Sequence, residues 1–160
     1  MLNVTLICVG KMREKHYIAA FQEYEKRLGA FCRFSLVELP EQRLPERPAQ
    51  REIDTALEKE AQSILDHVPK GAALVAMCVE GTELSSEKLA ERLTQWQNGG
   101  TSRLCFVVGG SFGLHDSVKT AAQLKLSMSR MTFPHHLARV MLMEQIYRAC
   151  TINAGTQYHK

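Results

Sequence analysis

The stretch Leu126-Ser-Met-Ser-Arg-Met-Thr-Phe-Pro-His-His136 leads directly into Leu137-Ala-Arg-Val-Met-Leu-Met-Glu-Gln-Ile-Tyr-Arg-Ala-Cys150. The first part has the pattern of a strand and the second that of a helix. Between them, Pro134 fixes its own φ angle and disfavours helical backbone at the residue before it. We therefore expect an extended loop over residues 129–133, with backbone N–H and C=O groups free to meet a ligand.

The helix predicted over residues 136–150 carries apolar side chains around about half of its circumference. Because this arc is broader than a surface helix needs, we expect the helix to pack against a second layer or a second subunit. Arg139 falls inside the arc. Its guanidinium must either meet an anion or carbonyl groups, or extend past the helix end to water, and the sequence leaves both open.

Short apolar runs alternate with amphipathic stretches along the rest of the chain. We predict strands over residues 2–9, 31–39, 73–79, 104–108 and 124–128, and helices near residues 17–28, 51–68, 86–97, 116–122 and 136–150. This alternation is typical of an α/β fold with a mainly parallel sheet and helices on both faces. The length suits one compact core and is short for two, so we predict a single domain over residues 1–160.

Three local predictions concern the connections between these elements. Gly29 is placed to end its helix in a left-handed conformation. Glu80-Gly81 is expected to form a turn after the third strand. Residues 40–50 hold three prolines among charged side chains, so we expect a mobile surface loop with no readable function.

The composition disfavours several classes of protein. The net charge of +3 is too mild for a polybasic binder. No apolar run approaches the ~18 residues of a membrane span, and no export signal is seen. The five cysteines make an odd count without a C-x-x-C pair, which indicates free thiols in a reducing cytoplasm. The histidines lack the spacing of metal ligands, so no metal site is expected.

The glycine-rich segment Gly109-Gly110-Ser111-Phe112-Gly113 directly follows the fourth predicted strand. Ligands bind beyond the carboxyl ends of parallel strands, where glycine lets the backbone approach them closely. The segment fits neither the Walker pattern nor the dinucleotide-binding pattern, and no nucleophile elbow indicates a hydrolase. A plain tight turn and a ligand-binding loop are therefore equally good interpretations.

A set of short motifs runs through the chain: Val-Gly-Lys at 9–11, Glu-Tyr-Glu-Lys-Arg-Leu-Gly at 23–29, Val-Val-Gly-Gly-Ser-Phe-Gly-Leu-His at 107–115, Leu-Ser-Met-Ser-Arg-Met-Thr-Phe-Pro-His at 126–135, Glu-Gln-Ile-Tyr-Arg-Ala at 144–149 and Tyr-His-Lys at 158–160. Each motif is weak alone, but together and in this order they are specific. The chain resembles the RlmH type of SPOUT-class RNA methyltransferases over essentially its whole length.

This resemblance implies a C-terminal segment threaded through a loop as a trefoil knot, and a homodimer. It implies transfer of a methyl group from S-adenosylmethionine to N3 of a pseudouridine in 23S ribosomal RNA, with the assembled ribosome, the free subunit and naked RNA all open as the substrate. Carried over residue by residue, the methyl-donor site comprises Met77, Gly109, Met128, Ser129, Arg130, Met131, Thr132 and Phe133. Family members carry aliphatic residues where this chain has Met77.

The resemblance and the chemistry together point to catalytic candidates. N3–H of a uracil-type base is a weak acid that must lose its proton before it attacks the methyl group. Groups that stabilise the resulting anion help most, which makes Arg148, Tyr158 and His159 the candidates, with the proton acceptor left open. We therefore expect the polar tail, residues 156–160, to be functional and to complete the donor pocket of a partner subunit.

The last helix is also the predicted dimer interface, through Met141, Met143, Ile146 and Tyr147. Two functions from other classes remain. A non-catalytic RNA- or ribosome-binding domain would need no methyl donor, and an α/β enzyme acting on a small phosphorylated metabolite would turn over without RNA. Binding of S-adenosylmethionine to the isolated protein separates the first of these from a methyltransferase.

Overall fold

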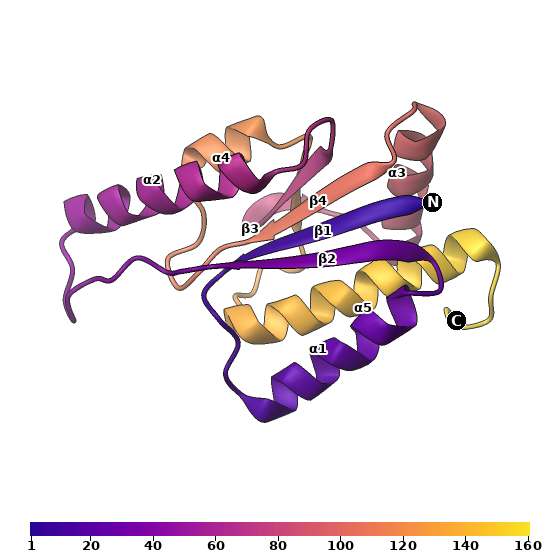
Figure 1. Cartoon of the computed structure of the whole chain (residues 1–160), viewed down its shortest axis with the longest axis horizontal. Coiled ribbons are helices and arrows are strands. Elements are labelled where there is room, and N and C mark those ends of the chain that lie inside the picture. Colours follow the sequence, from indigo (N-terminus) through magenta and orange to yellow (C-terminus); the bar gives the residue numbers. More distant parts are fainter.

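The computed structural model describes residues 1–160 and contains a five-stranded parallel sheet of order β2-β1-β4-β3-β5 (Figure 1). The strands are β1 (Leu2–Val9), β2 (Cys32–Leu39), β3 (Ala73–Glu83), β4 (Arg103–Val108) and β5 (Leu124–Ser127). The helices are α1 (Lys15–Leu28), α2 (Gln50–His67), α3 (Ser86–Asn98), α4 (Asp116–Ala121) and α5 (His135–Ala154). All strand pairs are parallel, which confirms the predicted α/β fold. The trefoil knot stays a prediction.

Helices cover both faces of the sheet, as predicted (Figure 1). Side chains alternate between the faces along a strand, so β1 serves two cores. Leu6 and Cys8 lie in the larger core, under α1, α3 and α5. Ile7 and Val9 lie in the smaller core, under α2 and α4. Burial on both faces explains why the last residues of β1 are apolar without alternation.

The longest helix, α5, packs against both α1 and α3. Met143 and Ile146 are 0% exposed in the core of their own chain. Their predicted role in a dimer interface is therefore wrong, because the sheet and the neighbouring helices already cover them. Met141 and Tyr147 are only partly buried. None of the helices combines the length and the apolarity needed to cross a membrane.

The predicted turn at Glu80-Gly81 is also wrong, because β3 continues through it to Glu83. An irregularity in β3 lets Met77 and Thr82 both pair with Leu126 of β5. A Cβ atom on Gly81 would lie 2.7 Å from the carbonyl carbon of Lys125, so only glycine allows this approach. An apolar run followed by polar residues does not distinguish a bulged strand from a strand that stops.

Gly29 does not adopt the predicted left-handed conformation, since its φ is −56°. Its N–H donates to the Lys26 carbonyl, three residues earlier. Two further hydrogen bonds of the same 3₁₀ type, from Ala30 and Phe31, lead the chain towards β2. These tight turns satisfy the last carbonyl groups of α1 without a left-handed residue. The left-handed glycine cap is found instead at Gly155, with φ +73°, where α5 ends four residues later than predicted.

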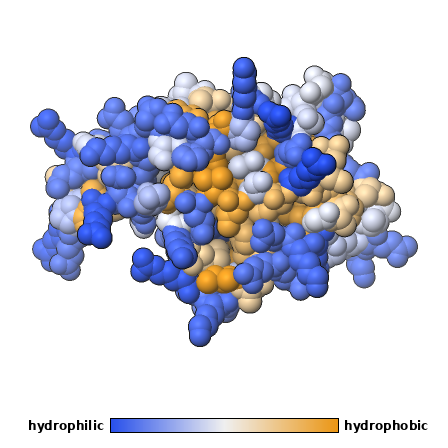
Figure 2. All heavy atoms as spheres, in the orientation of Figure 1, coloured by the Kyte–Doolittle hydropathy of each residue, from blue (hydrophilic) through white to orange (hydrophobic).

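The edge strand β2 is only partly covered. Figure 2 shows apolar side chains gathered over the middle of the face on which β2 lies, between hydrophilic side chains at both ends. Leu36 of β2 contributes to the exposed apolar surface, at 37% exposure. An edge position explains why β2 has a more polar sequence than β1 or β4.

Candidate functional site

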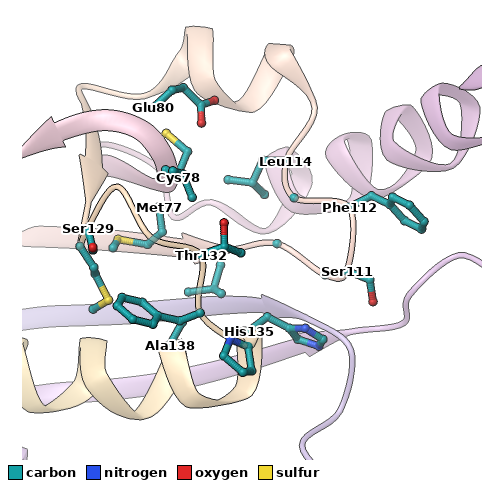
Figure 3. Close-up of a pocket in the computed structure, with 18 of the residues that line it drawn as sticks. Met77, Cys78, Glu80, Ser111, Phe112, Leu114, Ser129, Thr132, His135 and Ala138 are labelled. Atoms are coloured by element: carbon teal, nitrogen blue, oxygen red, sulfur yellow. The ribbon is translucent and has the colours of Figure 1, made fainter.

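A cavity of about 690 Å³ lies at the carboxyl ends of β3, β4 and β5 (Figure 3). Three segments supply most of its lining: the part of β3 from Met77 to Glu80, the loop from Gly109 to Leu114, and the loop that connects β5 to α5. Lys119 of α4 and Ala138 of α5 also line it. Met77, Leu114 and Thr132 reach it from these three directions. Ligands of parallel α/β proteins bind at this edge of the sheet.

All but one of the predicted donor-site residues line this single cavity. They are Met77, Gly109, Met128, Ser129, Met131, Thr132 and Phe133. Arg130 does not line it and is exposed. The structure thus brings together residues that are up to 56 positions apart in the sequence, counted from Met77 to Phe133. Their binding of a methyl donor stays a prediction.

The loop over residues 129–133 has neither helical nor strand structure, but bends at Arg130 and Met131 interrupt the extended backbone that Pro134 led us to predict. Ser127 Oγ donates to the Ser129 carbonyl at 2.9 Å, and Met131 N–H donates to Ser129 Oγ at 3.0 Å. The other N–H groups from Ser129 to Phe133 donate no hydrogen bond within the chain. Backbone donors beside a cavity are available to a ligand, and leaving them unpaired is costly when the site closes.

The glycine-rich loop is a tight turn and also part of the cavity wall. Gly113, with φ +80°, donates its N–H to the Gly110 carbonyl at 3.1 Å. A Cβ atom on Gly109 would overlap the carbonyl group of Gly113. Glycine at 109 is therefore needed for the loop to fold back on itself. The tight-turn interpretation is therefore confirmed, and binding of a ligand by this loop stays a prediction.

The cavity has mainly apolar walls with a charged pair at one side. Phe112 and Met131 are 48% and 73% exposed, which is high for large apolar side chains. The Glu80 carboxylate forms an ion pair with Lys119, and both line the cavity. The hydrogen bond from Lys119 lowers the pKa of Glu80, so this carboxylate is ionised at neutral pH. An apolar cavity with a few polar groups suits a nucleoside-sized ligand.

The three predicted catalytic residues also meet, in a second cluster. Arg148 Nε donates to Glu144 Oε1 at 2.7 Å along one turn of α5. The Arg148 guanidinium lies 4.8 Å from the centre of the Tyr158 ring, and its Nη1 lies 3.1 Å from His159 Nδ1. The tail therefore folds back onto α5 instead of extending into solvent.

Two carboxylates that sequence reasoning missed complete this cluster. Glu144 accepts a hydrogen bond from the Tyr158 hydroxyl at 3.3 Å, and Glu87 of α3 lies 2.7 Å from His159 Nε2. Burial, and then the charge of Glu144, raises the pKa of Tyr158. The hydrogen bond with His159 lowers the pKa of Glu87. The spacing of Glu144 and Arg148 was visible in the sequence, whereas nothing in it links Glu87 to the tail.

The cluster and the cavity are separate in this chain. None of Glu87, Glu144, Arg148, Tyr158 and His159 lines the 690 Å³ cavity. A second cavity of about 350 Å³, which Glu144 lines, shares Leu126 and Met128 with the first. No group of three or more His, Cys, Asp or Glu side chains is arranged to hold a metal ion.

Comparison with known proteins agrees with this geometry. The chain matches curated relatives named "Ribosomal RNA large subunit methyltransferase H" from Bifidobacterium animalis subsp. lactis (strain AD011) and Clostridioides difficile (strain 630). The two are 45% and 40% identical over 159 residues, which is 99% of this chain and 100% of each relative. The matches thus cover all but one of the residues of this chain.

The fold is similar to solved structures at low sequence identity. A putative methylase family protein from Neisseria gonorrhoeae gives a TM-score of 0.58 at 14% identity, over 99% of this chain and 87% of that one. A probable methylase family protein from Haemophilus influenzae Rd KW20 gives 0.57 at 11% identity, over 98% and 70%. A family model described as "Predicted SPOUT methyltransferase" matches residues 2–159. The chain therefore belongs to the SPOUT methyltransferase family.

Proposed function

We propose that this protein transfers a methyl group from S-adenosylmethionine to N3 of a pseudouridine in 23S ribosomal RNA, in the cytoplasm and on the assembled ribosome. The names of its relatives support the RNA class, and the family supports methyl transfer. The observation that carries the proposal is the convergence of the predicted donor-site residues on one cavity. A binding domain without a methyl donor has no need of such a cavity.

The lining of the cavity fits S-adenosylmethionine. Its volume is in the range of small-molecule sites. Leu114, Leu126 and Phe133 offer apolar surface to an adenine ring, and the unpaired N–H groups between Ser129 and Phe133 offer donors to its polar atoms. S-adenosylmethionine supplies an electrophilic methyl group on a sulfonium centre. The residues of the chain have to hold the RNA base in line with it and remove a proton.

Arg148 is suited to stabilise the base as its N3 becomes negative. The hydrogen bond to Glu144 raises the pKa of the guanidinium further above its usual value, so the charge is permanent. The guanidinium also lies 4.8 Å from the centre of the Tyr158 ring, which restrains its position. A fixed cation beside the base stabilises the anion more than a mobile one, because little reorganisation is needed.

His159 is the better candidate for proton acceptor. The two partners of the ring assign its tautomer. Nδ1 accepts a hydrogen bond from an Arg148 N–H, so Nε2 carries the hydrogen and donates it to Glu87. The raised pKa of Tyr158 keeps that hydroxyl protonated. With both ring nitrogens engaged, His159 must release Arg148 before it can accept the proton of the base.

We infer that a homodimer brings the cluster and the cavity together. The cluster does not line the cavity of its own chain, and both are needed for the proposed reaction. Met141 and Tyr147 of α5 are only partly buried and are available for an interface. In this arrangement the tail of one subunit completes the partner's site on the side where the RNA base binds, next to the methyl donor.

Radiolabelled methyl transfer tests the proposal. The protein is incubated with methyl-labelled S-adenosylmethionine and with ribosomes, free large subunits or naked RNA that lack the modification. We expect label in large-subunit RNA, highest with ribosomes, and none in small-subunit RNA. Donor binding measured by calorimetry without transfer to any RNA would contradict the proposed reaction. No donor binding at all would favour a non-catalytic RNA-binding domain.

A further inference from the structure

The segment between β2 and α2 is held at its start by two carboxylates. Gln42 N–H donates to Glu60 Oε2 of α2 at 2.8 Å, and Glu60 is only 7% exposed. Ser111 N–H donates to Glu41 Oε1 at 3.0 Å. The sequence predicted a mobile loop here, but its first residues are tied to a helix on one side and to the glycine-rich loop of the cavity on the other.

The carboxylate of Glu41 lies near Gly10 and Gly110, which follow β1 and β4. A Cβ atom on Gly110 would lie 2.7 Å from Glu41 Oε1, and one on Gly10 would lie 3.5 Å from Glu41 Oε2. Glu41 therefore lies directly against the loop at Gly110, although it is an exposed residue and does not itself line the cavity. Hydrogen bonds from backbone N–H groups to ionised carboxylates are among the stronger ones in proteins.

The glycine-rich loop has few other restraints. Apart from the bond between Gly113 N–H and the Gly110 carbonyl, the bond to Glu41 is the only hydrogen bond made by a backbone N–H from Gly109 to Leu114. Fixing the backbone of a glycine costs more conformational entropy than fixing that of other residues. A glycine-rich loop therefore keeps a single conformation only if contacts from other segments hold it.

We propose that Glu41 is a positioning residue of the methyl-donor cavity. Its carboxylate fixes Ser111, and so holds Ser111 and Phe112 in the places where they line the cavity. This rests on the proposed function, since it takes the cavity to bind S-adenosylmethionine. A loop that is already ordered needs less ordering when the donor binds, so Glu41 raises the affinity for the donor without touching the reacting atoms.

The test compares Glu41→Ala and Glu41→Gln with Glu46→Ala. Glu46 is an exposed carboxylate in the same segment and makes no hydrogen bond or ion pair. Calorimetry measures the affinity for S-adenosylmethionine, and amide hydrogen exchange measures the protection of Ser111 in the protein without donor. Methyl transfer at saturating donor measures kcat apart from donor KM.

We expect Glu41→Ala to weaken donor binding by ~10-fold and to speed exchange at Ser111, with kcat at saturating donor within about twofold of the parent. Glu41→Gln, whose amide oxygen can still accept the bond, should weaken binding by ~3-fold. Glu46→Ala should match the parent. The inference would be overturned if Glu41→Ala bound the donor with the affinity of the parent and Ser111 exchanged at the parent rate. If the alanine variant does not fold, the same result for Glu41→Gln would overturn it. Failure of the parent itself to bind the donor would refute the proposed function instead.

Discussion

His159 Nδ1 lies 3.1 Å from Arg148 Nη1, so the penultimate residue of the chain is bound to its last helix. The second ring nitrogen reaches Glu87 of α3, and the tail thereby bridges two helices. A terminal segment with no helical pattern is ordinarily frayed. Here the charged and aromatic groups proposed for catalysis contact one another within a single chain.

Removing the tail tests whether this arrangement is functional. Deletion of residues 156–160 should leave folding, dimerisation and S-adenosylmethionine affinity nearly unchanged, because Leu142, Met143 and Ile146 of the core remain in place. Methyl transfer should fall by at least ~100-fold, the scale of lost general acid-base help. The control is Lys59→Ala on the exposed side of α2, which leaves the whole tail intact and should transfer methyl groups at the parent rate. Transfer at the parent rate by the deletion variant would mean that the tail is passive.

Arg139 is predicted to be a major source of stability. The sequence left open whether its guanidinium reaches water, but it is 1% exposed and Nη2 donates to the carbonyls of Val9 and Gly10 at 2.8 and 2.7 Å. A contact to Glu38 at 3.3 Å completes the site, although Arg139 Nε has no partner. The guanidinium joins α5 to the end of β1.

Replacement of Arg139 by Met should lower the free energy of unfolding by ~2–4 kcal/mol, because buried carbonyl groups lose their donors. Urea denaturation gives the value. Arg33→Met on the exposed side of β2 is the control and should change stability by less than ~0.5 kcal/mol. Equal stability of the two variants would show that the buried guanidinium contributes nothing net.

Gly109→Val is expected to damage the donor cavity through the loop itself. The new Cβ would overlap the Gly113 carbonyl group, so the turn must open. S-adenosylmethionine affinity measured by calorimetry should fall by at least ~10-fold, and overpacking should cost ~1–3 kcal/mol of stability. Gly99→Ala serves as the control, because its Cβ would make an ordinary contact at 3.4 Å. Unchanged affinity in Gly109→Val would remove this loop from the donor site.

Glu60 should give stability a specific dependence on pH. Burial raises the pKa of its carboxyl, with the N–H of Gln42 acting in the opposite direction. Between the ordinary value of about 4.3 and the raised value, the folded state keeps a proton that the unfolded state has lost, so stability falls as the pH rises through that window.

The variant Glu60→Gln removes this titration, while its amide oxygen can still accept the Gln42 bond. Urea denaturation from pH 4 to pH 8 should show the parent losing stability relative to the variant as the pH rises. Glu58→Gln on the exposed side of α2 should show no such trend. A difference between parent and Glu60→Gln that is constant with pH, or that has the opposite slope, would contradict the assignment.

Periodicity predicted the strands, the helices and the two-faced sheet because these depend on local patterns of burial. It failed where the outcome depends on distant partners. The apolar arc of α5 could not show whether Met143 faces its own sheet or a second subunit. Arg139 donates hydrogen bonds to carbonyl groups that lie 129 and 130 positions earlier in the chain. The bulge in β3 depends on its pairing with β5.

The candidate site divides in the same way. The resemblance named the donor loops and the tail, and the structure places Arg148, Tyr158 and His159 in contact. Glu41 and Glu87 could not be recognised, since their partners lie 70 and 72 positions away in the sequence. The sequence around a glutamate in a charged segment does not show whether its carboxylate is solvated or accepts a hydrogen bond from a distant loop.

The position of the transferred methyl group tests the central claim most directly. Ribosomes that lack the modification are incubated with the protein and labelled S-adenosylmethionine, and their 23S RNA is digested to nucleosides for mass spectrometry. The account predicts one methylated nucleoside, a pseudouridine with the methyl group on N3. Label on a ribose, on another base or on another RNA would contradict it.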